Sequence, residues 1–92
     1  GLAFVEYHLF NYDKAMEQLS KAENIEALNP DIYYVKALIQ YEQGKKNDAL
    51  RNSAIAIGLE QDHEGANHLS NFILKEKRRE HLKIIRGSRT LH

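Results

Sequence analysis

Apolar residues recur every three or four positions along most of the chain, which is the spacing of one face of an α-helix. The segment after Asn11 shows this clearly, with Ala15, Met16, Leu19 and Ala22 on one face. Valine is scarce and proline occurs once, at Pro30, while residues that favour helices are abundant. The pattern predicts an all-α chain of about five helices, over residues 1–9, 12–27, 31–43, 48–59 and 63–86.

Residues that start and stop helices separate these segments. Side-chain oxygens of Asn, Asp or Ser at an N-cap accept bonds from free helical N–H groups, proline suits the first turn, and glycine suits the left-handed end. We expect N-caps at Asn11, Asn29, Asn47 and Asp62, proline in the first turn at Pro30, and helix ends at Gly44 and Gly87-Ser88.

The chain also repeats itself. A shift of 34 positions superimposes identical residues, among them Ala3 on Ala37, Tyr7 on Tyr41, Ala15 on Ala49 and Ala22 on Ala56. Apolar positions coincide at the same shift, as for Val5 and Ile39. Each copy contains two predicted helices, so the repeated unit is a pair of helices.

This 34-residue pair of helices resembles the tetratricopeptide repeat (TPR) family over about residues 1–61. In the second copy, Tyr33-x-x-Lys36-Ala37-x-x-Gln40 stands where the family has Trp-x-x-Leu-Gly-x-x-Tyr, and Ala49 and Ala56 take the two small positions of the second helix. In the first copy, Leu2-Ala3, Tyr12, Ala15, Leu19 and Ala22 match the pattern. The chain departs from it at Lys36, Lys46 and Ser53.

The resemblance implies antiparallel helical hairpins stacked as a short right-handed solenoid. We expect residues 1–92 to form a single TPR-like domain, an excerpt of a longer protein. It would comprise a partial first repeat (1–28), a second repeat (29–61), a third or capping helix (62–86) and a frayed tail (87–92). Small side chains such as Ala37 let the helices approach closely.

The resemblance also implies a concave groove lined by the first helix of each repeat, which would bind a peptide or a segment of a partner protein. The residues that it places there are Phe4, Tyr7, His8, Asp31, Tyr34, Leu38, Tyr41, Glu42, His68, Phe72 and Lys75. Tyr12 and Tyr33 are expected in the core instead.

Charge is unevenly distributed although the net charge is zero. Acidic residues dominate residues 1–74, whereas residues 75–89 carry seven basic residues and two acidic ones. The expected basic patch is Lys75, Lys77, Arg78, Arg79, Lys83 and Arg86. Three interpretations stay open, in decreasing order of preference. The patch is a solvated helix face with local pairs such as Glu76 with Arg79 or Lys77 with Glu80. Alternatively, it contacts an acidic surface of a partner, of this chain or of another copy, or it contacts nucleic acid or anionic lipid.

The sequence offers no catalytic arrangement. Cysteine is absent, which excludes disulfides and thiolate metal sites. The close histidine pair, His63 and His68, is five positions apart and suits surface residues better than metal ligands. No apolar run approaches the ~18–20 residues of a membrane helix, and no basic stretch precedes the first apolar residues as in a signal peptide. We therefore expect no cofactor, no metal, no membrane span and no enzyme.

The favoured hypothesis is a non-enzymatic protein-interaction module of intracellular, cytoplasmic location. The alternatives are a scaffold segment that associates with copies of itself, for which Leu82, Ile84 and Ile85 would supply an apolar patch, and a regulatory segment that contacts nucleic acid through residues 75–89.

Overall fold

A computed structural model describes residues 11–90 of the chain, and the side chains of residues 11–82. All regular structure in this range is helical, so the predicted all-α class is confirmed. The four helices are α2 (Tyr12–Ile25), α3 (Pro30–Glu42), α4 (Lys46–Leu59) and α5 (Glu64–Thr90). About five were expected; the helix expected over 1–9 lies outside the described residues.

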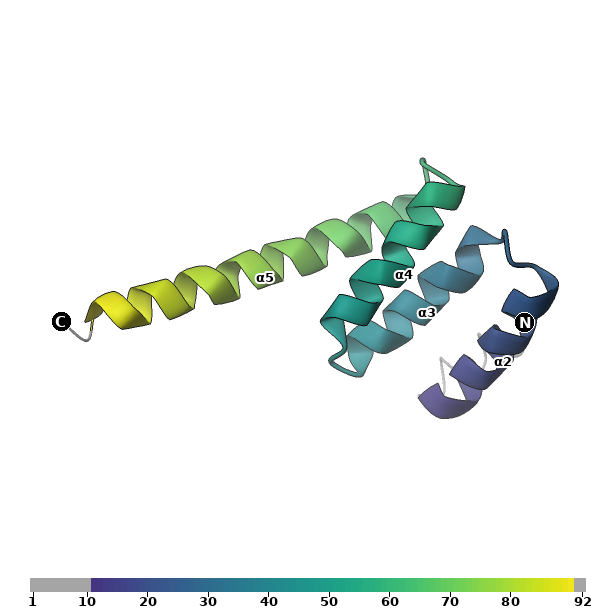
Figure 1. The fold of residues 1–92 in the computed structure, drawn as a ribbon, viewed down its shortest axis with the longest axis horizontal. Helices are drawn as coiled ribbons and strands as arrows, with labels where there is room; N and C mark the ends of the chain where they lie inside the picture. Colours follow the sequence, from purple (N-terminus) through teal and green to yellow (C-terminus); the bar gives the residue numbers. More distant parts are fainter. Residues whose placement is uncertain (1–10, 91–92) are drawn as a thin grey trace.

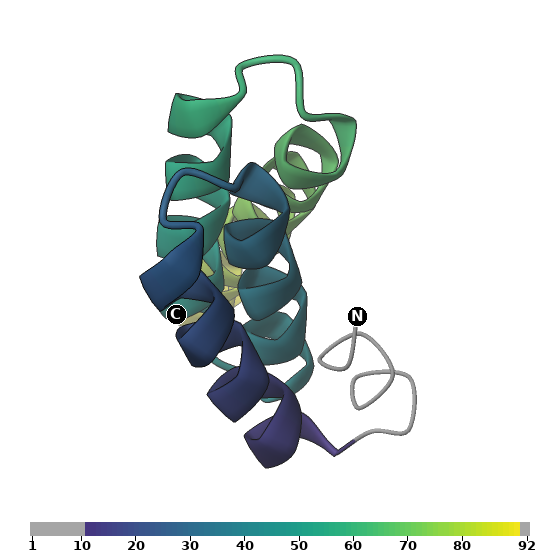
Figure 2. The same cartoon turned by 90° about the vertical axis from the view of Figure 1, so that its right-hand side faces the viewer.

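The helix boundaries follow the spacing seen in the sequence. Helix α4 starts and ends 34 positions after α2, and α5 starts 34 positions after α3. Helices α2, α3 and α4 lie side by side, each antiparallel to the next (Figure 1). Figure 2, turned by 90°, shows the connection that carries the chain from the end of α4 to the start of α5.

Helix α3 is the centre of the core because it buries side chains toward all three neighbours. Ile32, Val35 and Ile39 pack against Ala15 and Leu19 of α2. On another side, Ala37 packs with Ala49 of α4 and with Leu69 and Ile73 of α5. The third cluster joins Tyr33 to Ala56 and Ala66, so the expected core position of Tyr33 is confirmed.

The small residues are buried where helices meet. Ala37 and Ala49 are fully buried in one cluster, as the expected close helix contact requires. A larger side chain at either position would push two backbones apart, at a cost of roughly 1–3 kcal/mol.

Two buried polar residues stand in this apolar surrounding. Lys36 extends from α3 to α2, where its Nζ donates to Glu23 Oε2 at 3.0 Å. This bond to Lys36 holds the pKa of the Glu23 carboxyl below its ordinary value. Ser53 is fully buried, and its hydroxyl has no hydrogen-bond partner among the described residues.

Two predicted caps are wrong and two are confirmed. Asn11 and Asn29 accept backbone N–H bonds at the starts of α2 and α3. Helix α4 starts two residues early, after Lys45 and without a side-chain cap, because the Asn47 side chain accepts a bond from Lys77 of α5 instead. Helix α5 starts after His63 rather than Asp62, and His63 Nδ1 accepts from the Ala66 N–H at 3.0 Å.

Helix ends also differ from the expectation. Helix α2 ends at Ile25 rather than Ala27, and α3 ends one residue early at Glu42. Gly44 has φ +80° there, so the predicted glycine turn is confirmed; the Lys45 and Gly44 N–H groups close it on Gln40 O and Tyr41 O. Helix α5 continues past Gly87-Ser88 to Thr90, since a glycine within a helix costs only about 1 kcal/mol and no proline follows.

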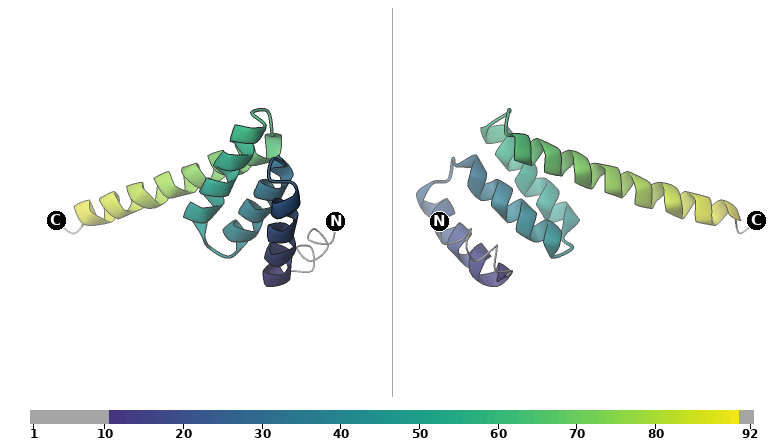
Figure 3. Two further views of the ribbon diagram at one scale, coloured as in Figure 1. Left: turned by 45° about the vertical axis from the view of Figure 1, so that its right-hand side comes forward. Right: turned by 180° about the vertical axis from the view of Figure 1, so that it is seen from behind.

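Helix α5 has two parts. Its first part, residues 64–80, contacts α4 and α3, and its second part, residues 81–90, extends away from the other helices (Figures 1 and 3). Glu80 is the last residue with a described side chain that bonds to another helix, whereas Leu82 is 46% exposed. Within the described range, none of the helices is both long and apolar enough to cross a membrane.

Candidate functional site

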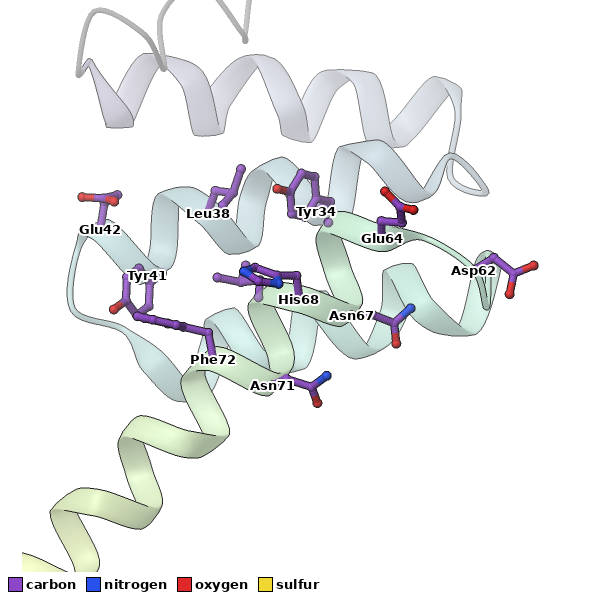
Figure 4. Close-up of a pocket in the computed structure, with 12 residues that line it drawn as sticks. Tyr34, Leu38, Tyr41, Glu42, Asp62, Glu64, Asn67, His68, Asn71 and Phe72 are labelled. Carbon is purple, nitrogen blue, oxygen red and sulfur yellow. The ribbon is translucent and has the colours of Figure 1, made fainter.

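A groove of about 820 Å³ lies between α3 and the first part of α5. Aromatic and apolar side chains form its middle, and polar or acidic ones stand around them (Figure 4). The lining residues are Tyr34, Leu38, Tyr41, Glu42, Asp62, Glu64, Gly65, Asn67, His68, Leu69, Asn71 and Phe72.

Tyr34 forms one end of the apolar middle and is held by α5. Its ring lies directly over the backbone of Gly65, so that a Cβ at Gly65 would come within 2.6 Å of Tyr34 Cζ. Its ring centroid is also 5.0 Å from that of His63. Tyr34 is half-buried, and a Cβ at position 65 would force its ring to move.

His63 connects the starts of α3 and α5. Its Nδ1 accepts from Ala66 N–H, so Nε2 carries the proton and donates to Asp31 Oδ1 at 2.8 Å. The side chain is only 10% exposed. The expected role of a solvated surface histidine is therefore wrong for His63, which has a structural role at a helix start.

Tyr41 and Phe72 form the other end of the apolar middle. Their rings meet edge to face with centroids 5.8 Å apart. The Tyr41 hydroxyl donates to Glu76 Oε1 at 2.8 Å, and this bond to a carboxylate raises the pKa of Tyr41. Phe72 is 47% exposed and lines the groove.

The groove carries negative charge at both ends. Glu42 stands at the Tyr41 end, and Asp62 and Glu64 stand at the Tyr34 end (Figure 4). All three are exposed, and among the described side chains no lysine or arginine lines the groove. Within the part of the chain that the structure describes, none of the three forms an ion pair.

The structure brings together six of the residues expected in a groove: Tyr34, Leu38, Tyr41, Glu42, His68 and Phe72. Asp31 lies outside the groove and bonds to His63. Lys75 is exposed on α5 but is not a lining residue. Phe4, Tyr7 and His8 lie outside the described residues.

Sequence reasoning missed Asp62, Glu64, Gly65, Asn67, Leu69 and Asn71 as lining residues. Of these six residues, the 34-residue shift would have added only Gly65 to the expected set, because it places Gly65 on Asp31, which was expected in the groove. Asn67 had no such signal, since its amide donates to Gln61 O and His63 O and so depends on the turn before α5.

The basic patch begins at Lys75, near the end of the first part of α5, and continues into the second part. Lys75, Arg78 and Arg79 are exposed, whereas Lys77 donates to Asn47 of α4. The expected local pairs of Glu76 with Arg79 and of Lys77 with Glu80 do not form. Instead, Glu76 accepts from Tyr41, and Glu80 accepts from Lys46 Nζ at 2.6 Å. The side chains of Lys83 and Arg86 lie outside the described range.

Metal-ligating side chains do not gather in the described residues, where no group of three or more His, Asp or Glu could hold an ion. Compared with known protein families and with curated proteins, the chain matches none.

Proposed function

We propose that this chain is a non-enzymatic protein-interaction module that binds a peptide or partner segment in the groove between α3 and α5. The observation that carries the proposal is an apolar middle, with Phe72 half exposed, inside a rim of polar and acidic side chains. Binding sites for peptides combine apolar anchoring pockets with a polar rim in this way.

The lining side chains suit recognition without chemistry. Tyrosine and phenylalanine offer a large contact area at a low cost in side-chain entropy. Tyr34 and Tyr41 are already held by Gly65 and Glu76, so the groove is preorganised and less ordering is needed on binding. The polar groups at the rim can accept or donate bonds to a peptide backbone.

The wider architecture that we propose is a short TPR-like stack. Its support is the 34-residue recurrence of helix boundaries together with the buried alanines at Ala37 and Ala49. In such a stack, α3 and α5 are the first helices of successive repeats and present their side chains to one concave surface.

A library of random peptides displayed on phage and selected against the whole chain tests the function. The diagnostic variant is Phe72→Ala, because Phe72 is half exposed and its loss should leave the fold intact. Tyr34 is a poorer choice, since it also packs on Gly65. Ile55→Ala on α4 is the matched control, as Ile55 is 40% exposed and outside the groove.

Selected peptides should bind the Phe72→Ala variant at least about tenfold more weakly, as expected for an aromatic residue at the centre of an interface. They should bind the Ile55→Ala variant as tightly as the unchanged chain, and all three proteins should melt at similar temperatures. A selection that yields no peptide sensitive to Phe72→Ala contradicts the proposal.

A further inference from the structure

We infer that the groove binds residues 78–86 of α5 from another copy of this chain. The inference rests on the proposed function, because it names the segment that the same groove would take. It joins two features of the fold that are otherwise unpaired: an acidic groove at one end of α5 and a basic segment at the other.

The first feature is the charge of the groove. One end of the groove carries Glu42, and the other carries Asp62 and Glu64. These three side chains are exposed and lack a basic partner in the described range. The two ends flank the aromatic and aliphatic side chains of the middle (Figure 4). A segment that fits would carry positive charge at both ends and apolar residues between them.

The second feature is a segment of this composition. Residues 78–86 read Arg-Arg-Glu-His-Leu-Lys-Ile-Ile-Arg, with Arg78 and Arg79 at one end, Arg86 at the other, and apolar residues between. Its single acidic residue, Glu80, is already bonded to Lys46 of the same copy. The free charge of the segment is therefore positive.

The lengths agree as well. Tyr34 and Glu42 lie at opposite ends of the groove. They are eight positions apart along α3, which corresponds to about 12 Å at 1.5 Å per residue. Arg79 and Arg86 are seven positions apart along α5, which corresponds to a length of about 10 Å. Each end of the segment can therefore reach one acidic end of the groove.

A copy cannot fill its own groove with this segment. Helix α5 is continuous from Glu64 to Thr90. Its second part points away from the groove (Figures 1 and 3). His68 and Leu82 are 14 positions apart along the helix, which corresponds to about 21 Å. A second copy has no such constraint.

Such a contact is heterologous, because one copy offers its groove and the other its helix end. Each added copy leaves one groove and one helix end free, so assembly continues beyond dimers unless the chain of copies closes into a ring. Because the contact pairs exposed charges, higher salt should weaken it.

Sedimentation velocity on the whole chain, over a range of concentrations at low and high salt, tests the inference. Two charge-reversed variants separate the two surfaces. One carries Glu42→Lys with Asp62→Lys in the groove, and the other carries Arg78→Glu with Arg79→Glu on α5. Matched controls change the same charges elsewhere: Glu17→Lys with Glu60→Lys, and Lys14→Glu with Lys45→Glu, all at exposed positions.

The unchanged chain should form species larger than dimers at low salt. Each reversed variant alone should lose assembly, with an apparent Kd raised about tenfold or more, while the controls assemble normally. Mixing the two reversed variants should restore assembly, because the intact α5 of the first meets the intact groove of the second, and the two reversed surfaces also carry opposite charges.

A chain that stays monomeric at high concentration and low salt overturns the inference, as does assembly that both reversals leave unchanged, or a mixture that stays monomeric. The peptide selection tests the proposed function separately. If selected peptides bind the groove of a monomeric chain, the groove is a peptide site whose ligand is not α5 of a second copy.

Discussion

The two parts of α5 differ in what they contact, although they are one continuous helix. In the first part, Ala66, Leu69 and Ile73 pack against α3 and α4. The same face then continues with Glu76, Lys77 and Glu80, which bond to polar partners on those helices. After Glu80 the helix leaves the other helices. One helix thus changes along its length from apolar packing to hydrogen bonds and then to an exposed basic end.

This difference shows that helix formation and docking are separate outcomes. The second part of α5 is helical although its described side chains, at residues 81 and 82, are exposed, because adding a residue to an existing helix avoids the cost of a new nucleus. Docking depends instead on which side chains recur on the inner face. Four substitution experiments sharpen this comparison, from the largest expected effect to the smallest.

The largest effect should come from Ile73→Ala in the first part of α5. Ile73 of α5 is fully buried against α3 and α4. Its truncation removes apolar contacts and leaves a cavity, which should lower the free energy of unfolding by about 2–5 kcal/mol. Leu74→Ala, one position along, is the control. Leu74 is exposed, and its truncation should change stability by no more than about 0.5 kcal/mol. Urea unfolding measures both, and equal losses would contradict the packing described.

A pair of glycine substitutions should have opposite signs. Gly65→Ala introduces a Cβ into the Tyr34 ring and should destabilise the chain by about 1–3 kcal/mol, despite the better helix propensity of alanine. Gly58→Ala in α4 meets nothing within 4 Å and should stabilise the chain by up to about 1 kcal/mol. Thermal unfolding of both variants is the measurement. A stabilising Gly65→Ala would mean that Tyr34 does not pack on α5.

The start of α5 depends on His63. His63→Ala removes both the bond from the Ala66 N–H and the bond to Asp31, and should cost about 1 kcal/mol, as for other N-caps. His63→Asn can still accept from a helical N–H and should recover most of this loss. His81→Ala, on the exposed second part of the same helix, should have no effect. Amide hydrogen exchange over residues 64–70 would locate the change, and a His63→Asn variant as unstable as His63→Ala would exclude the capping role.

The smallest effect concerns pH and the last bond of α5 to the other helices. The bond from Lys46 holds the pKa of Glu80 below its ordinary value of 4.5, and the bond to Glu80 raises the pKa of Lys46 above 10.5. Its contribution is therefore fully present above about pH 4.5 and is lost as pH falls through the lowered pKa of Glu80. At the alkaline end, it is present below pH 10.5 and is lost as pH rises through the raised pKa of Lys46.

NMR titration of the Glu80 carboxyl and of amide exchange near residue 80 follows this loss. Glu80→Gln should remove the acidic transition of that exchange while the exchange around Leu69 stays unchanged. An acidic transition that survives in Glu80→Gln would assign it to another carboxyl group.

Much of the fold could be predicted from local patterns. The spacing of apolar residues located α2 to α5 because side chains three and four positions apart share a helix face. Asn29, Pro30 and Gly44 marked the limits of α3, since capping and left-handed turns involve only neighbouring residues. The 34-residue shift anticipated that Ala37 and Ala49 are buried at helix contacts.

The errors have a common cause. Asn47 and Asp62 are suitable caps by local rules, yet Asn47 bonds to Lys77 and the cap of α5 is His63. Glu76 and Glu80 had suitable partners within α5, yet they bond to Tyr41 and Lys46. In each case a residue about 30 positions away, or a backbone group fixed by the turn, competed with the local partner.

The sequence by itself determined that the chain is helical, where its turns fall, which alanines are buried and where charge gathers, because these depend on neighbours along the chain. Only the tertiary structure decided that Glu42, Asp62 and Glu64 surround an apolar groove, that Gly65 receives the Tyr34 ring, and that α5 leaves the other helices after Glu80. Those features depend on the distances between helices, and the spacing of residues within one helix does not specify these distances.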